Sequence, residues 1–146
     1  MSSNLSEKAK KIFSENQNNC SQAVFTAYVE HLGLGEVDYD TCMKITSAFG
    51  GGIAQTGNVC GALTGALMAL GLKYGGTKRE GNEKAKKVAG NLLNEFKSLN
   101  GSIMCRELIN HDLITDDDIK QAYEKGSFNN CPKFVEDVSM MLEKLL

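Results

Sequence analysis

Four of the five cysteines in this 146-residue chain follow a polar or glycine-containing turn and stand at the start of a helix-like run. They are Cys20, Cys60, Cys105 and Cys131. The N-terminus of a helix presents unpaired N–H groups and a partial positive charge, which favour a thiolate over a thiol. Thiolates attack disulfides and bind metal ions. The shared setting of the four cysteines therefore predicts a chemical site.

The spacing of these cysteines requires that the fold assemble any common site. No CxxC pair occurs, and the four residues are separated by 40, 45 and 26 positions. Neither a thioredoxin-type dithiol nor a zinc-ribbon knuckle is therefore encoded locally. Several helix N-termini must converge, and their positive dipole ends or a metal ion would offset the repulsion between thiolates.

Three kinds of site are compatible with this pattern. All four thiolates together could bind zinc or an iron–sulfur cluster, which makes the set a candidate group of metal ligands. Two of them could instead cycle between dithiol and disulfide, with Cys60 as the expected attacking thiolate and Cys20 as the second candidate catalytic residue. The third kind is a substrate-binding or catalytic pocket, in which one reactive cysteine would face the glycine-rich stretch at 50–57.

The alternative is that the cysteines are buried free thiols that act as small hydrophobic residues. The protein would then be a helical interaction module with inert cysteines. Cys42 is assigned to this role, because it lies inside a predicted helix beside Met43 and Ile45 rather than at a helix start.

Two glycines follow Cys60 at helical spacing. Gly61 and Gly65 lie four positions apart, so one helix face lacks side chains and another backbone can approach it closely. A helical glycine costs about 1 kcal/mol relative to alanine, so two in one turn indicate a compensating need. That need is either tight helix packing or room around the Cys60 sulfur, to which Gly51 and Gly52 would contribute. We count these four glycines as candidate cofactor-binding residues.

Repeated 3.6-residue periodicity, one proline and few β-branched runs predict an all-α protein. We expect one domain over 1–146, a compact bundle of about six to eight helices around a buried central helix. The expected helices cover 5–14, 20–32, 38 or 40 to 49, 60–73, 77–100, 105–109, 115–126 and 131–146. In the longest of them, one apolar face is expected to carry Val88, Leu92, Phe96 and Leu99.

Composition restricts the class of partner. A formal charge of −2 and a pI near 5.7 do not indicate the basic surface that nucleic-acid binding requires. The strongly apolar stretch at 59–72 is too short to span a bilayer, and the N-terminus lacks the apolar core of a signal peptide. An odd number of cysteines fits reduced thiols. We expect a cytoplasmic protein with an unidentified electron-transfer or thiol partner, and a homo-oligomer remains open.

The order of these residues resembles a known family pattern. The matching features are Cys20, Gly51-Gly52, Cys60-Gly61-Ala62-x-x-Gly65, Cys105 and Cys131. They resemble the C_GCAxxG_C_C family, whose members are named redox-active for their cysteines, and the likeness covers nearly the whole chain. The resemblance implies a redox role without an established substrate. A similar domain occurs in a multihaem cytochrome with an iron–sulfur site, which favours a cluster by analogy, although this chain has no CxxCH for haem.

Overall fold

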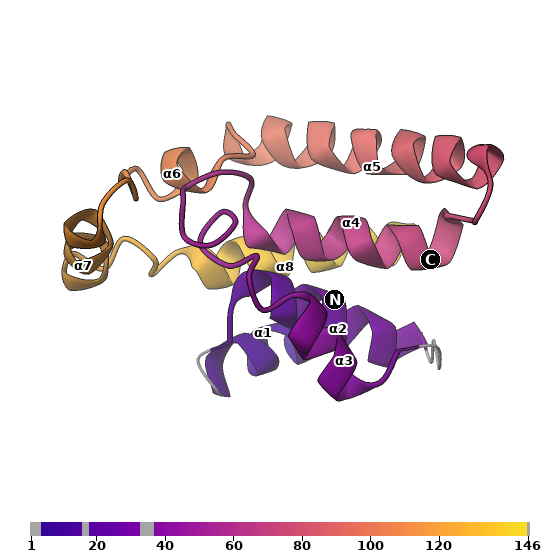
Figure 1. Ribbon diagram of the computed structural model, residues 1–146, viewed down its shortest axis with the longest axis horizontal. Helices are drawn as coiled ribbons and strands as arrows, with labels where there is room; N and C mark the ends of the chain where they lie inside the picture. Colours follow the sequence, from indigo (N-terminus) through magenta and orange to yellow (C-terminus); the bar gives the residue numbers. More distant parts are fainter. Residues whose placement is uncertain (1–3, 16–17, 33–36, 146) are drawn as a thin grey trace.

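The computed structural model describes residues 4–15, 18–32 and 37–145, and within these ranges the regular structure consists of eight helices without a strand. The helices are α1 (Asn4–Glu15), α2 (Cys20–Leu32), α3 (Tyr39–Ile45), α4 (Gly61–Tyr74), α5 (Arg79–Asn100), α6 (Cys105–Leu108), α7 (Asp116–Glu124) and α8 (Cys131–Lys144) (Figure 1). The predicted all-α class is confirmed.

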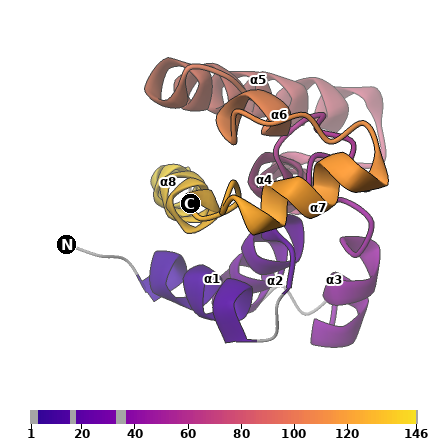
Figure 2. The same ribbon diagram turned by 90° about the vertical axis from the view of Figure 1, so that its left-hand side faces the viewer.

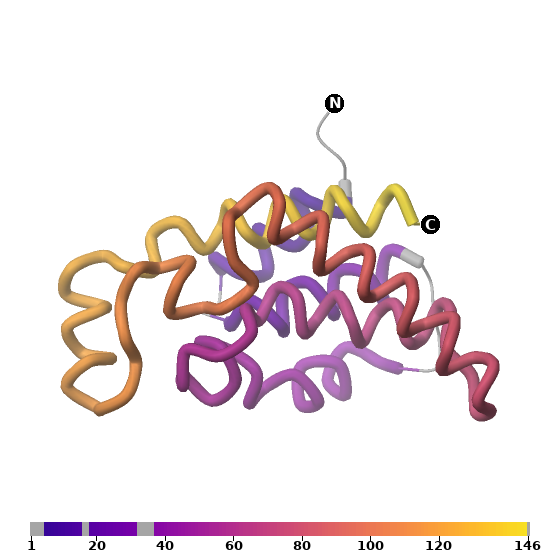
Figure 3. The backbone as a smooth tube through the Cα atoms, turned by 90° about the horizontal axis from the view of Figure 1, so that it is seen from above, coloured from indigo at the N-terminus to yellow at the C-terminus, as the bar shows by residue number. Residues whose placement is uncertain are grey.

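Helix α4 lies in the middle of the bundle and packs against α2, α5 and α8. Half of its 14 residues are buried, as a helix covered on several sides requires. Helices α2, α4 and α8 all begin at the same end of the molecule (Figures 1 and 3). Helix α7 lies across that end and stands in front of it in Figure 2. Three helix N-termini therefore meet beneath α7.

The contact between α2 and α4 depends on the two glycines of α4. A Cβ added to Gly65 would lie 2.6 Å from the backbone oxygen of Ser21, and one added to Gly61 would lie 3.2 Å from the Cβ of Cys20. The Thr64 hydroxyl also donates a hydrogen bond to the Ser21 hydroxyl at 3.2 Å. Close approach of the two helices is thus the need that offsets the cost of glycine in this turn.

Side-chain caps fix several helix starts. The Asn19 side chain accepts from the backbone N–H of Gln22 at 2.8 Å, and the Gln22 side chain accepts from the backbone N–H of Asn19 at 3.0 Å. Thr115 and Asp118 form the same reciprocal capping box at α7. Gly101 ends α5 in the left-handed conformation, with φ of 87°. These local signals explain why most predicted boundaries lie within two residues of the observed ones.

Two expectations are corrected by the structure. Helix α3 ends at Ile45 rather than at residue 49, because the Thr46 hydroxyl donates to the Cys42 carbonyl at 2.6 Å and the chain turns there. Leu99 is 59% exposed and does not belong to the inward face of α5. That face ends at Phe96, which packs edge-on against Phe134 with ring centroids 6.1 Å apart, and Leu99 lies one turn beyond this contact.

No helix in the described ranges combines the length and the apolar character needed to cross a bilayer.

Substituting Gly65 by alanine tests the α2–α4 contact. We expect Gly65→Ala to lower the free energy of unfolding by about 1–3 kcal/mol, because the new methyl group overlaps the α2 backbone. The matched control is Gly90→Ala in α5, where a Cβ would meet nothing within 4 Å; it should raise the free energy of unfolding by about 0.5–1 kcal/mol. Urea denaturation followed by circular dichroism measures both, and equal stabilisation by the two substitutions would contradict the proposed contact.

Candidate cysteine site

The four helix-start cysteines line one small cavity beneath α7. Its volume is about 30 Å³, close to the space of one water molecule, and Gly51, Gly61 and two phenylalanines also line it. Cys60, Cys105 and Cys131 are buried, whereas Cys20 is half-buried. All of these cysteines are free thiols. The structure thus brings together four residues that are far apart in sequence.

Each of the four occupies the start of a helix. Cys20, Cys105 and Cys131 are the first residues of α2, α6 and α8, and Cys60 is the N-cap of α4. The predicted helix-start setting is confirmed to within one residue. Since α2, α4 and α8 begin at the same end of the bundle, the partial positive charges of their N-termini act on one cavity.

A single β-bridge positions Cys60 and Cys105. Val59 and Met104 form this antiparallel bridge, and the N–H groups of Cys60 and Cys105 each donate to a carbonyl of the opposite segment, at 2.8 and 2.6 Å. Successive side chains of an extended segment point to opposite sides. Both cysteines therefore lie on the side of the bridge opposite to Val59 and Met104, and the bridge couples the start of α4 to the start of α6.

The chain between α3 and α4 forms a left-handed turn, and Gly51 of this turn lines the cavity. Five consecutive residues, 51–55, have φ between 51° and 72°, and three of them (Ile53, Ala54 and Gln55) are not glycine. Each non-glycine residue in this conformation costs about 1–2 kcal/mol. Backbone hydrogen bonds hold the turn, among them those from Gln55 to Gly50 at 3.0 Å and from Gly57 to Gly51 at 3.0 Å. The expected glycine-rich loop is thus a turn with a defined conformation, held by its own backbone hydrogen bonds.

The four candidate glycines occupy different places. Gly51 and Gly61 line the cavity. Gly52 lies outside its lining, but a Cβ there would come within 2.7 Å of the Cβ of Cys105, so the glycine makes room for that cysteine. Gly65 contacts α2 and does not line the cavity. A cofactor-binding role for any of them stays a prediction.

Burial controls the protonation of two of the thiols. It raises the pKa of Cys60 to about 11 and that of Cys105 to about 12. The backbone N–H groups of Ala62 and Leu63 lower the pKa of Cys60 but offset burial only in part. Both residues are therefore neutral thiols at neutral pH. Burial outweighs the helix N-terminus here, which differs from the expectation of Cys60 as the attacking thiolate.

Cys20 and Cys131 line the same cavity, and their thiols interact as a pair. Donation from the Cys20 thiol lowers the pKa of Cys131, and the same bond, followed by burial and the neighbouring cysteines, raises the pKa of Cys20 well above its ordinary value. Of the four thiols at the cavity, only Cys131 has a lowered pKa. The pair therefore gives up one proton readily and retains the other.

A cleft of about 710 Å³ opens beside the pair; we call it the Cys20 cleft. It shares Cys20, Gly51 and Phe128 with the cysteine cavity. Its rim joins the left-handed turn to α7, because the Gln55 side-chain amide donates to the Tyr123 hydroxyl at 3.0 Å. Gln55 belongs to the glycine-rich stretch at 50–57 that was expected to face a reactive cysteine, whereas no sequence motif marked Tyr123 or Phe128.

The cysteine set as it stands does not fit a resident metal ion. In the described ranges, no group of three or more His, Cys, Asp or Glu side chains is arranged to hold one. The predicted metal-ligand role of the four cysteines is therefore without geometric support.

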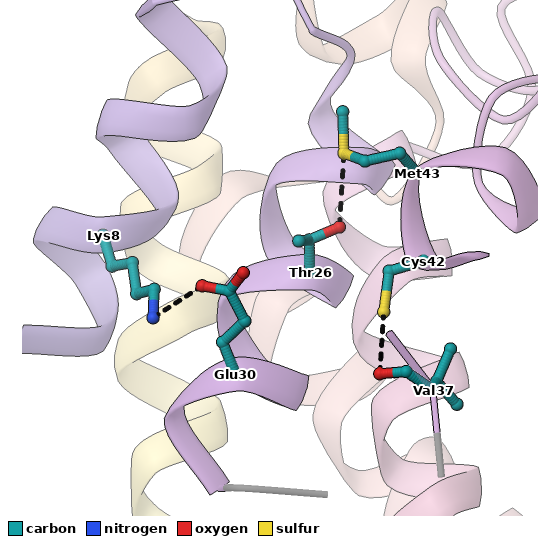
Figure 4. A network of polar contacts seen from close by, with 6 residues as sticks. All are labelled: Lys8, Thr26, Glu30, Val37, Cys42 and Met43. Atoms are coloured by element: carbon teal, nitrogen blue, oxygen red, sulfur yellow. Dashed lines mark hydrogen bonds and ion pairs between the residues drawn. The ribbon is translucent and has the colours of Figure 1, made fainter. Parts of the chain in front are cut away.

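Cys42 lies apart from the cavity, between α2 and α3 (Figure 4). It is fully buried, and its thiol donates to the carbonyl of Val37 at 3.8 Å. Beside it, the Thr26 hydroxyl contacts the Met43 sulfur at 3.4 Å. These neighbours match the predicted role of a small hydrophobic residue in the core.

The fold and the cavity define an all-helical protein with four converging thiols. Residues 18–145 match the family model described as "Putative redox-active protein (C_GCAxxG_C_C)", and the chain belongs to this family. Neither a curated protein nor a solved structure matches the chain.

The hydrogen bond between the two thiols is testable by pH titration. We expect the ultraviolet absorbance of the reduced protein to report one thiolate that forms below the ordinary cysteine pKa of about 8.5. In Cys20→Ala the donor is lost while burial persists, so the pKa of Cys131 should rise above its ordinary value. Cys20→Ser retains a donor and should keep the pKa of Cys131 lowered.

The control for this titration is Cys42→Ala, which should leave the low-pH transition in place. A transition in Cys20→Ala at the same pH as in the unmodified protein would show that Cys20 does not stabilise the thiolate.

Proposed function

We propose that this protein is a thiol–disulfide redox protein in which Cys20 and Cys131 cycle between dithiol and disulfide. The observation that carries the proposal is that these two thiols, at the first residues of α2 and α8, line one small cavity together with Cys60 and Cys105. Their mutual interaction lowers the pKa of Cys131 and raises that of Cys20. A thiol in contact with a stabilised thiolate is the arrangement that disulfide exchange requires.

The exchange begins at Cys20, which borders the Cys20 cleft. With an organic disulfide bound there, the Cys20 proton passes to the Cys131 thiolate, and the Cys20 sulfur attacks one substrate sulfur. The substrate S–S bond breaks, and the leaving thiolate takes the proton from Cys131. The Cys131 thiolate then attacks the Cys20 sulfur and releases the second thiolate, which takes a proton from water. Two electrons move from the pair to the substrate.

Cys60 and Cys105 would serve as neutral neighbours of the pair. Their raised pKa values keep them protonated, so they add no negative charge next to the Cys131 thiolate. The sequence-based assignment of Cys60 as a catalytic residue remains open to test in the same experiment, because its thiol lines the same cavity. A reducing compartment such as the cytoplasm would return the pair to the dithiol form.

Oxidation in glutathione buffers of graded potential tests the proposal. After alkylation of free thiols and peptide mapping, we expect a Cys20–Cys131 disulfide that appears with a single midpoint potential. Cys131→Ser should lose this disulfide, whereas Cys42→Ser should retain it at an unchanged potential. Cys60→Ser should retain the Cys20–Cys131 disulfide if Cys60 is only a neutral neighbour of the pair.

Two results would overturn the proposal in favour of the other readings. Zinc or iron in stoichiometric amount in anaerobically purified protein, lost on substitution of these cysteines, would establish a metal site. Five thiols that all remain alkylatable after oxidation, in a protein without metal, would favour a helical interaction module with inert cysteines.

A further inference from the structure

We infer that the Cys20 cleft binds an extended, uncharged segment of a partner protein, the segment that carries the disulfide exchanged at Cys20. This inference rests on the proposed function and adds the class of substrate. The cleft is the place to look for a substrate, because it borders Cys20 and shares Gly51 and Phe128 with the cysteine cavity. Its volume of about 710 Å³ lies in the range of ligand sites and exceeds what a disulfide alone needs.

Among the described residues that line the cleft, none has a charged side chain. A carboxylate or ammonium group entering it would lose hydration without meeting an opposite charge, which is unfavourable. Small charged thiols are therefore poor occupants. A neutral peptide segment, in contrast, brings only backbone N–H and C=O groups and uncharged side chains.

The polar groups of the lining match a peptide backbone. The Asn18 side-chain amide donates to the Ile12 carbonyl at 3.1 Å and that of Gln55 donates to Tyr123, so each side chain still offers its oxygen as an acceptor. Among the described residues, none donates to these two oxygens, and none accepts from the backbone N–H groups of Gly50 and Gly51. The residues that line the cleft thus offer both acceptors and donors to an extended chain.

The rim of the cleft exposes apolar surface of the kind found at protein interfaces. The Tyr123 side chain on α7 is 62% exposed, and its ring packs against that of Phe128 in a tilted arrangement, with centroids 4.8 Å apart. Ile53, in the left-handed turn next to the lining residue Ala54, is 39% exposed. A β-branched residue rarely adopts a φ of 67°, and such backbone strain concentrates at functional sites. Exposed tyrosine in particular often dominates binding energy.

Exchange rates with paired disulfide probes test the inference. The probes are the disulfide-linked dimer of an uncharged, end-capped peptide with one central cysteine, the same dimer with glutamates flanking the cysteine, and 2-hydroxyethyl disulfide. We expect the reduced protein to react about tenfold faster with the uncharged peptide than with either other probe, the difference that one good contact supplies. Tyr123→Ala should remove most of this advantage and lower the rate with the uncharged peptide toward the rate with 2-hydroxyethyl disulfide.

The matched control is Tyr39→Ala, which removes an exposed tyrosine that does not line the cleft and should change none of the three rates. Equal rates for all probes, or a preference for the charged or the small probe, would overturn the inference and leave the proposed function standing. Loss of reaction with every probe in the unmodified protein would overturn the proposed function, and the inference with it. Circular dichroism of Tyr123→Ala confirms that its fold persists.

Discussion

The close contact between α2 and α4 is the constraint on which the site depends. Because Gly61 and Gly65 present no side chain to α2, the two helices start side by side, which places Cys20 next to the backbone that follows Cys60. Helix α8 starts at the same end and adds Cys131. A larger residue at either glycine would separate α2 from α4 and widen the cavity. The packing of the core thus decides whether the thiols can react with one another.

Convergent helix N-termini alone do not activate these thiols. A helix dipole contributes roughly 0.3–1 kcal/mol, and up to about 2 kcal/mol in partly buried sites, whereas full burial can shift a pKa by about 3–5 units. Burial accordingly prevails at Cys60 and Cys105, whose pKa values rise to about 11 and about 12. Cys131 differs because a neighbouring thiol donates a hydrogen bond to it. The neighbouring Cys20 thiol, rather than the shared position at a helix start, thus determines which cysteine has the lowered pKa.

The helix boundaries and the inward-facing apolar positions could be predicted from the sequence, because they depend on local patterns. Caps such as Asn19 and Thr115, and the apolar stripe of α8, act over a few residues and are visible as patterns. The division of four equivalent cysteines into a hydrogen-bonded pair and two neutral thiols is tertiary, since it depends on the Val59–Met104 bridge and on burial. For the left-handed turn, the glycines were the only feature of the sequence that indicated its conformation. Ile53 argued against it, because a β-branched residue disfavours the positive φ that the turn imposes.

The size of the cavity assigns the two roles within the pair more firmly than the pKa values do. A space of about one water molecule admits no organic disulfide, so exchange must occur at its boundary. Cys20 lies at that boundary, and Cys131 is buried behind it. In the proposed exchange, the mixed disulfide therefore forms on Cys20, whichever thiol holds the negative charge at rest. Cys131 is then the residue proposed to resolve it, and its interaction with Cys20, which lowers its pKa, favours that second attack.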